Sequence, residues 1–370
     1  MKKIAIMTWY TFRNYGTVLQ AVALNRVIRD FGYDVSTIAY NPLERKKPFA
    51  ERVLNKIERL LSASDYSSDE KELLFENFIK ENICLTSKIH SSEEFHRLNS
   101  DFDAFVCGSD QIWGPRWLDT RFYLDFVEKA DCKIAYAPSF GCSEIPEDDK
   151  RKKISSCLMD FGSISVREKS GAEIVESLIG EKPPVVLDPT LLLDDEKWDE
   201  YARTCFDKSK RYCLFYFLGN NPQNYHVAKK IAEDKGLKIK ILPVFSKDFK
   251  LESSIHESVG PSEFLTLLKN ADYVCTDSFH GMVFSVIFHK QFVAFERFKR
   301  TGGKSQNTRI YNFLNLMGLN NVLLRQDSLN EWEQKTNLSI DYKHVDDRLE
   351  TLRKDSLVYL KSALDRAACL

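Results

Sequence analysis

The sequence predicts an α/β protein with two domains, each built around a parallel sheet. The chain has 370 residues, of which 43% are hydrophobic, and this is enough for two domains with cores of their own. Short apolar runs alternate with longer amphipathic ones, a pattern typical of parallel strands joined by helical crossovers. Polar residues collect directly after the apolar runs, and open parallel sheets bind ligands at that end of their strands.

The first half of the chain begins this alternation. Residues 4–9 are predicted to form a strand, residues 17–31 a helix that ends at Gly32, and residues 34–40 the next strand. Later apolar runs predict four more strands, at residues 104–107, 133–137, 163–166 and 185–187. Residues 41–101 break the rhythm, and we interpret them as a helical insertion in the first domain.

The insertion contains basic residues at 45–47 and an amphipathic pattern at 52–61. Such a stretch either touches the cytoplasmic face of a membrane as a peripheral helix or forms a solvated helical hairpin. The residues alone leave both interpretations open.

The second half of the chain repeats the alternation. Strands are predicted at residues 212–218, 237–243 and 271–275, and helices at residues 226–234, 261–269, 282–290 and 345–368. The expected domains are residues 1–205, residues 206–344, and a C-terminal helix at 345–370 that packs back on the N-terminal domain.

The overall composition excludes several classes of protein. A net charge of −1 gives no general attraction to nucleic acid or to an anionic membrane, and no apolar run approaches the length of a transmembrane helix. The apolar run at the N-terminus is too short for a signal-peptide core. The nine cysteines are odd in number and form no CxxC pair, which favours reduced thiols in a cytoplasmic protein. We therefore expect a cytoplasmic protein without a metal site.

Polar residues follow six of the predicted strands. These segments are residues 11–16, 108–111, 138–141, 167–170, 188–190 and 276–281. Each one alone is ordinary turn or helix-capping chemistry. Structural turns do not require Arg, Gln and His together, however, and the backbone N–H groups at such joints favour an anionic ligand. The sequence therefore predicts an anion-binding crevice.

His280 is the candidate for proton transfer in this crevice. It directly precedes Gly281 between a strand and a helix, so its imidazole can lie over the crevice, and histidine titrates near neutral pH. Asp277 or Ser278 is a candidate to orient it. The alternative is a histidine with a purely structural role in the core or on the surface.

Arg167 closes the predicted strand at 163–166, where its planar guanidinium suits a carboxylate or a phosphate. The alternative is an ion pair with Glu168 or Asp188.

Motifs at these joints resemble the polysaccharide pyruvyl transferase family. They occur in the same order along nearly the whole chain: NYG at 14–16 with LQA at 19–21, GSDQIW at 108–113, SVRE at 165–168, LDPTLLL at 187–193 and TDSFHG at 276–281. The resemblance implies two Rossmann-like domains facing across a cleft, similar to GT-B glycosyltransferases. It also implies transfer of a pyruvyl group from phosphoenolpyruvate to a sugar of a surface polysaccharide, with a cyclic ketal and phosphate as products.

The resemblance implies roles for His280 and Arg167, and neighbouring polar residues are expected to complete the site. His280 is the expected general acid or base, with Asp277 as its catalytic partner. Donor-binding residues are expected at Arg167, Ser278, Gly281, Arg309 and Ser139. Acceptor-binding residues are expected at Arg13, Asn14, Tyr15, Gly16, Gln20, Ser109, Asp110 and Gln111. Phosphoenolpyruvate is a co-substrate, and no cofactor or metal is expected.

One position departs from the family pattern. Several members carry arginine two places before this histidine, where the present chain has Ser278, so another arginine is needed to grip the donor from that side. Arg309 and Arg13 are the candidates.

The expected acceptor is a sugar, carried on an undecaprenyl diphosphate lipid at the inner face of the cytoplasmic membrane. Two alternatives stay open. One is a nucleotide-sugar glycosyltransferase of the GT-B type, and the other is a non-catalytic subunit of a polysaccharide assembly complex.

Overall fold

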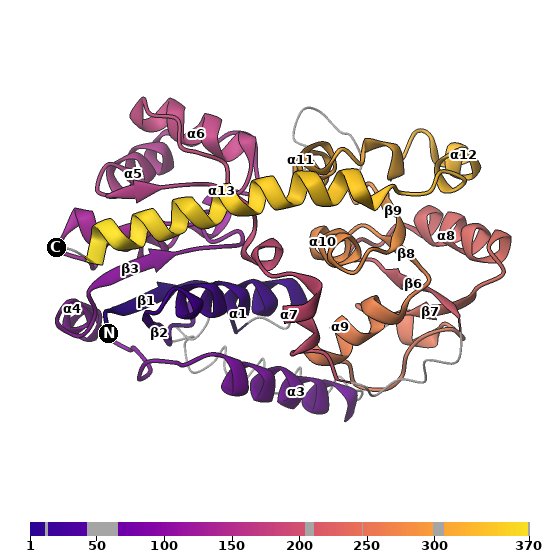
Figure 1. The fold of residues 1–370 in the computed structure, drawn as a ribbon, viewed down its shortest axis with the longest axis horizontal. Helices are drawn as coiled ribbons and strands as arrows, with labels where there is room; N and C mark the ends of the chain where they lie inside the picture. Colours follow the sequence, from indigo (N-terminus) through magenta and orange to yellow (C-terminus); the bar gives the residue numbers. More distant parts are fainter. Residues whose placement is uncertain (12–13, 43–65, 204–210, 246, 299–306, 369–370) are drawn as a thin grey trace.

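The strands of the protein form two separate sheets. The computed structural model describes residues 1–11, 14–42, 66–203, 211–245, 247–298 and 307–368. Within these residues there are two five-stranded sheets, and every pairing between neighbouring strands is parallel. Figure 1 shows the sheets side by side, each with its own helices, and we call these units the first and second lobes.

The first lobe has the strand order β2-β1-β3-β4-β5. Its strands are β1 (Lys3–Met7), β2 (Asp34–Thr37), β3 (Ala104–Cys107), β4 (Lys133–Ala135) and β5 (Ser163–Ile164). Its helices include α1 (Tyr15–Asp30), α3 (Tyr66–Asn82), α4 (Ser92–Asp101), α5 (Asp148–Leu158) and α6 (Lys169–Ile179). The order reverses direction between β1 and β3, and this is the point at which such sheets open a crevice for ligands.

The second lobe repeats this topology, with the order β10-β9-β8-β6-β7. Its strands are β6 (Tyr212–Tyr216), β7 (Lys238–Ile241), β8 (Tyr273–Thr276), β9 (Gln291–Phe295) and β10 (Leu323–Leu324). Its helices include α8 (Pro222–Asp234), α9 (Pro261–Asn270), α10 (Phe279–Ile287), α11 (Thr308–Met317) and α12 (Trp332–Thr336). Its direction reverses between β6 and β8, so each lobe has one such opening.

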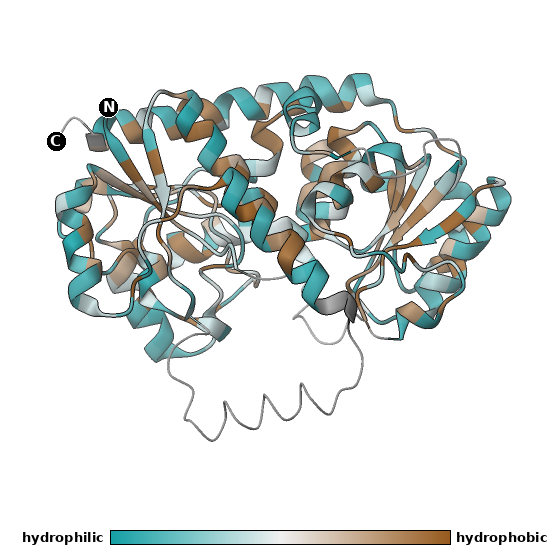
Figure 2. Cartoon of the chain, turned by 90° about the horizontal axis from the view of Figure 1, so that it is seen from below, coloured by the Kyte–Doolittle hydropathy of each residue, from teal (hydrophilic) through white to brown (hydrophobic). Residues whose placement is uncertain are grey.

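The central strands are buried throughout and mostly apolar, because helices cover both faces of each sheet. All residues of β3 and of β8 are buried, and Figure 2 shows brown, hydrophobic residues gathered in the strands and on the inner faces of the helices. The lobes also share apolar contacts. Tyr15 of α1 stacks on Phe264 of α9 with ring centroids 4.4 Å apart, and its hydroxyl donates a 3.0 Å hydrogen bond to the carbonyl of Val259.

The last helix, α13 (Tyr342–Ala368), runs across both lobes (Figure 1). It contacts β3 and β4 of the first lobe, the short 3-10 helix η5 (Pro189–Leu192), and α11 of the second lobe. Ser356 on this helix accepts a 3.0 Å hydrogen bond from the backbone N–H of Leu187. The helix therefore holds the segment that leads into Asp188.

The predicted fold class is confirmed: the chain consists of two Rossmann-like α/β domains. The exact domain boundaries stay a prediction. The predicted strand at 185–187 is wrong, because only Val185 forms an isolated bridge, to Val166, and Pro183 and Pro184 have no N–H to donate. Residues 43–65, with the predicted basic and amphipathic segments, lie outside the described residues. Within the part of the chain that is described, no helix has the length and apolar character needed to cross a bilayer.

Candidate active site

His280 lies in the first turn of α10, directly after β8. Ser278 caps this helix, and its Oγ accepts a 3.3 Å hydrogen bond from the backbone N–H of Gly281. A Cβ on Gly281 would lie 2.4 Å from Oγ1 of Thr276, so only glycine permits this close approach of helix and strand. The helix thus starts three residues earlier than its apolar pattern predicts. His280 is 7% exposed, and its Nε2 has no hydrogen-bond partner.

The N-terminus of α1 meets the same imidazole from the first lobe. Asn14 caps α1, and its Oδ1 accepts hydrogen bonds from the backbone N–H groups of Gly16 and Thr17 at 3.0 and 3.4 Å. A Cβ on Gly16 would lie 1.8 Å from Nδ1 of His280, so the ring packs directly on the backbone of α1. Two helix N-termini therefore converge on His280, and their partial positive charges favour an anion.

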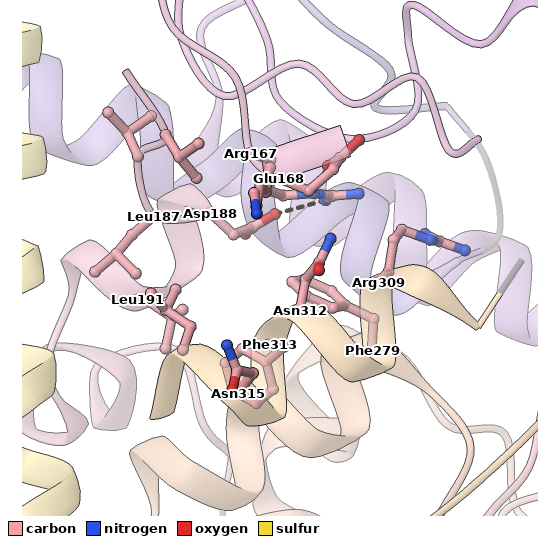
Figure 3. Close-up of a pocket in the computed structure, with 14 residues that line it drawn as sticks. Arg167, Glu168, Leu187, Asp188, Leu191, Phe279, Arg309, Asn312, Phe313 and Asn315 are labelled. Carbon is pink, nitrogen blue, oxygen red and sulfur yellow. Dashed lines mark hydrogen bonds and ion pairs between the residues drawn. The ribbon is translucent and has the colours of Figure 1, made fainter. Parts of the chain in front are cut away.

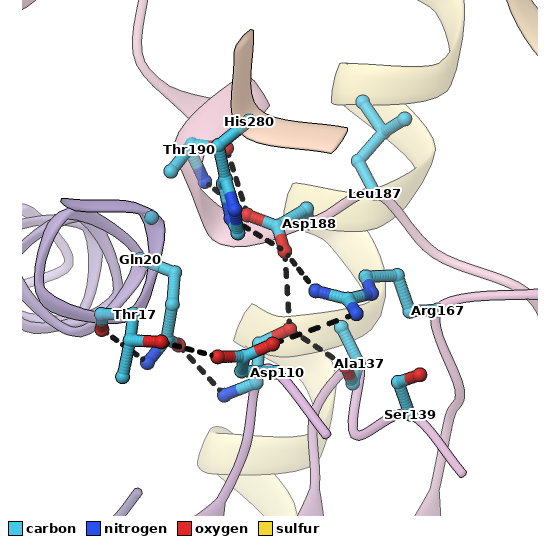
Figure 4. A network of polar contacts seen from close by, with 12 residues as sticks. Thr17, Gln20, Asp110, Ala137, Ser139, Arg167, Leu187, Asp188, Thr190 and His280 are labelled. Carbon is cyan, nitrogen blue, oxygen red and sulfur yellow. Dashed lines mark hydrogen bonds and ion pairs between the residues drawn. The ribbon is translucent and has the colours of Figure 1, made fainter. Parts of the chain in front are cut away.

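Asp188 is the carboxylate nearest to His280, with its Oδ2 3.9 Å from the imidazole Nε2 (Figure 4). Its Oδ2 accepts a 2.8 Å hydrogen bond from Nη1 of Arg167, and its Oδ1 accepts from the N–H and hydroxyl of Thr190. Asp188 thus connects the imidazole of the second lobe to the guanidinium of the first. The sequence placed Asp188 at a polar strand end and offered it as a possible ion-pair partner of Arg167, but not as a neighbour of His280.

Arg167 is buried among acidic groups. Besides its bond to Asp188, it lies 3.7 Å from Asp110 and 3.7 Å from Glu168, and its guanidinium stacks 4.7 Å from the ring centroid of Phe279. The ion-pair interpretation is therefore correct for the free protein. Nε and Nη2 of Arg167 nevertheless have no hydrogen-bond partner, and these are the donors that an anionic ligand would need.

Burial and neighbouring charges together set the protonation of His280 and Asp188. Burial lowers the pKa of His280 below its ordinary value, and the opposing effect of the Asp188 and Asp110 charges does not cancel it. Burial alone would raise the pKa of Asp188, but the Arg167 guanidinium, the imidazole and its hydrogen bonds hold that pKa below the usual value. A neutral imidazole therefore lies next to an ionised carboxylate at neutral pH.

Asp277 points away from His280. Its carboxylate oxygens accept hydrogen bonds from the backbone N–H groups of Leu218 at 2.6 Å and Gly219 at 2.9 Å. Arg297 donates a 2.9 Å hydrogen bond to the carbonyl of Asp277. Both contacts fix the loops at the end of β6 and β9, so the prediction that Asp277 orients His280 is corrected, and the carboxylate beside the imidazole is that of Asp188 at 3.9 Å.

The predicted acceptor residues of the first lobe come together, but as an internal network. Gln20 is fully buried; its Nε2 donates to Thr8 and to the carbonyls of Trp9 and Thr17, and its Oε1 accepts from the N–H of Ser109. Asp110 accepts a 2.6 Å hydrogen bond from Thr17.

The remaining acceptor candidates lie around this network. Tyr15 is buried between the lobes, whereas Asn14 is exposed and Gln111 is half-buried. Arg13 lies outside the described residues.

Of the predicted donor residues, Ser139 lies in the first lobe and Arg309 in the second. Ser139 donates a 2.8 Å hydrogen bond to Glu168 and so positions the acid beside Arg167. Arg309 lies in the first turn of α11; its Nε has no hydrogen-bond partner, and it forms no ion pair within the described residues. Burial, reinforced by the nearby Arg167 charge, lowers the pKa of Arg309 to about 10.

A cavity of about 300 Å³ lies between the lobes beside Arg167 and Arg309 (Figure 3). Asp188 and Phe279 also line it, together with the segment at 185–191 and one face of α11. The described residues contain no cluster of three or more His, Cys, Asp or Glu side chains suited to a metal ion.

Two solved structures share this architecture over nearly their whole length. Medicago truncatula UGT71G1, crystallised with UDP-glucose, aligns at a TM-score of 0.51 with 12% identity over 99% of this chain and 98% of its own. UDP-N-acetylglucosamine 2-epimerase from Rickettsia bellii aligns at 0.51 with 11% identity over 99% and 97%. At such identities the alignments show the GT-B type of fold alone.

A search of curated protein sequences gives no match. The family model for polysaccharide pyruvyl transferase matches residues 14–297, a span that includes both helix N-termini, Arg167, Asp188 and His280. This chain is a transferase that belongs to the polysaccharide pyruvyl transferase family.

Proposed function

We propose that the protein transfers a pyruvyl group from phosphoenolpyruvate to two hydroxyls of a sugar, releasing phosphate. The sugar belongs to a surface polysaccharide or to its precursor on undecaprenyl diphosphate, at the inner face of the cytoplasmic membrane. The observation that carries the proposal is the neutral, buried His280 between two helix N-termini, close to Arg167, whose Nε and Nη2 donate no hydrogen bond. Arg309 is the cation that we assign in place of the arginine missing at position 278.

The reaction needs a group that removes hydroxyl protons from the sugar. Neutral His280 suits this role, and the imidazolium that results would lie 3.9 Å from the Asp188 carboxylate. The methylene carbon of the donor gains a proton and becomes a methyl group, and its C2 forms two bonds to sugar oxygens as its bond to the phosphate oxygen breaks. One hydroxyl proton is balanced by the new methyl group and the other by the hydrogen phosphate. Positive charge around the donor supplies electrostatic stabilisation.

The nucleotide-sugar alternative needs a diphosphate site in the second lobe. Such sites use backbone N–H groups at the end of the strands on either side of the switch point, here β6 and β8. The N–H groups of Leu218 and Gly219 at this place already donate to the Asp277 carboxylate. This occupied position favours a small phosphorylated donor over a nucleoside diphosphate.

The decisive experiment incubates the protein with phosphoenolpyruvate and a panel of lipid-linked oligosaccharides. The expected results are phosphate release that depends on an acceptor and a pyruvyl mass gain on that acceptor. Release of a nucleoside diphosphate from a nucleotide sugar would support the glycosyltransferase alternative. Inactivity of the pure protein with every donor, together with activation of a partner enzyme, would support the non-catalytic alternative.

His280→Ala tests the residue that the proposal depends on. We expect turnover to fall by about 10²-fold or more, since general acid–base groups contribute that much, while binding of phosphoenolpyruvate persists. Full acceptor-dependent turnover by His280→Ala would exclude the catalytic assignment.

A further inference from the structure

The cavity between the lobes has two chemically different ends. Arg167, Glu168, Asp188 and Arg309 lie at one end with the amide of Asn312 beside them, and the other end is lined by uncharged side chains: Phe313 and Asn315 of α11, with Leu187 and Leu191 (Figure 3). A small phosphorylated donor would bind at the end with the two arginines. The uncharged end is then free for a different ligand.

Two amides line the cavity, and that of Asn312 is the one open to a ligand, because Oδ1 of Asn315 already accepts a 3.2 Å hydrogen bond from Nδ2 of Asn320. Asn312 and Asn315 are three residues apart on α11 and therefore share one face of the helix. Asn312 is half-buried, its side chain forms no hydrogen bond with another described residue, and Figure 3 shows its amide on the side of Asp188 and Arg167. Each amide both donates and accepts hydrogen bonds, as a sugar hydroxyl does.

The other walls suit the apolar faces of a sugar ring. Phe313 is buried with its ring centroid 5.5 Å from that of Phe279, and Leu187, Leu191 and Leu316 continue the apolar surface. Ligand pockets commonly combine mostly apolar walls with a few convergent polar groups, and about 300 Å³ is at the small end of their range. One monosaccharide unit fits this description better than an extended chain.

Asp188 connects this cavity to the proposed chemistry. It lines the cavity, and its Oδ2 is 3.9 Å from Nε2 of His280. A hydroxyl that donates to Asp188 would therefore lie near the imidazole that we propose removes its proton. We infer that this cavity is the acceptor-sugar subsite, with Asn312 as a specificity-determining residue; the inference rests on the proposed function. The cavity takes the acceptor role that the sequence assigned to residues near the N-terminus of α1. Of those residues, Tyr15, Gln20 and Ser109 are buried and already hydrogen-bonded within the protein.

The test compares Asn312→Leu with a matched control, Asn330→Leu. Asn330 is exposed on the short 3-10 helix η8 (Leu329–Glu331) of the same lobe, far along the chain from α11. Saturation-transfer NMR measures binding of the methyl glycosides of glucose, galactose and mannose in the presence of phosphoenolpyruvate, and calorimetry measures binding of phosphoenolpyruvate alone. Thermal melting of each variant confirms that it is folded.

We expect at least one glycoside to bind the wild-type protein and Asn330→Leu. Asn312→Leu should bind it at least tenfold more weakly, because it removes both amide functions at similar volume, and should bind phosphoenolpyruvate within twofold of wild type. Glycoside binding that survives Asn312→Leu, or no glycoside bound by the wild type, would overturn the inference. Glycoside binding that is lost on Asn312→Leu in a protein that binds no phosphoenolpyruvate would support the subsite and refute the proposed donor.

Discussion

At the scale of single residues, His280 and Asp188 determine the protonation state of the site. Burial lowers the pKa of His280, so the neutral imidazole persists below the pH at which an exposed histidine becomes charged. The Asp188 charge opposes this shift, since it favours the imidazolium. The acidic limb of the pH–rate profile therefore reports on both residues.

Asp188→Asn should move that acidic limb to lower pH. The substitution removes a negative charge that raises the pKa of His280, so the imidazole would stay neutral in more acidic solution. The measurement is the logarithm of residual kcat/KM against pH. Asp346→Asn is the matched control, because Asp346 pairs at 2.9 Å with the exposed His289 away from the site. A limb that stays in place, or moves to higher pH, would show that Asp188 does not act on His280.

Gly16→Ala tests how closely the imidazole must pack on α1. Its Cβ would lie 1.8 Å from Nδ1 and 2.2 Å from Cγ of the buried His280, so the ring must move. We expect turnover to fall at least tenfold and the melting temperature to fall, because the displaced ring has little free space around it. Kinetics and thermal melting measure the two effects, and unchanged turnover would show that catalysis does not need the imidazole at this place.

The polar strand ends in the sequence identified His280 and Arg167 but not the partner of the imidazole. Asp277 was expected to orient the imidazole because it is close to His280 in sequence. Asp188 is distant in sequence and lies 3.9 Å from the ring because the two lobes pack together. Contacts between distant segments cannot be read from local pattern. The same reason explains Tyr15, which was expected to bind sugar and instead stacks between the lobes.

At the scale of elements, the apolar runs predicted most strands because parallel strands are covered on both faces. The strand at 185–187 failed because the N–H of Leu187 donates to Ser356 of α13 instead of a neighbouring strand, which leaves one bridge, between Val166 and Val185. Helix starts were less accurate: α10 begins at Phe279 because Ser278 caps it, and its apolar pattern does not show this. No element was assigned at α11, although its Arg309 was named as a candidate for the donor site.

Ser278→Ala tests whether this residue is a cap or a donor ligand. Loss of the capping hydrogen bond to Gly281 should cost about 1 kcal/mol of unfolding free energy, and Ser278→Gly only a few tenths. Urea unfolding measures both values, and calorimetry should show unchanged binding of phosphoenolpyruvate. Binding weakened tenfold with unchanged stability would assign Ser278 to the donor site instead.

At the scale of the whole molecule, the site depends on α13, although this helix is the last element of the sequence. Ser356 accepts a hydrogen bond from the N–H of Leu187, and Arg353 donates a 2.7 Å hydrogen bond to the carbonyl of Leu191. The helix therefore holds the backbone before and after Asp188. The sequence predicted this helix, while its contacts with both lobes required the folded structure.

Ser356→Ala should destabilise the protein by about 1–3 kcal/mol, because the buried N–H of Leu187 loses its acceptor. Ser362→Ala, at an exposed position of the same helix, should stay within about 0.5 kcal/mol of the wild type. Denaturant unfolding compares the two. An equal loss of unfolding free energy in the two variants would show that the N–H of Leu187 donates to water or to another acceptor.

Arg167 and Asp188 belong to the first lobe, whereas His280 belongs to the second. A small rotation of one lobe against the other would leave the ion pair intact but lengthen the 3.9 Å separation between carboxylate and imidazole, along with contacts such as the stacking of Tyr15 on Phe264. Any molecule that wedges the lobes apart would thus act as an inhibitor without touching a reacting group, and one that clamps them together would act as an activator.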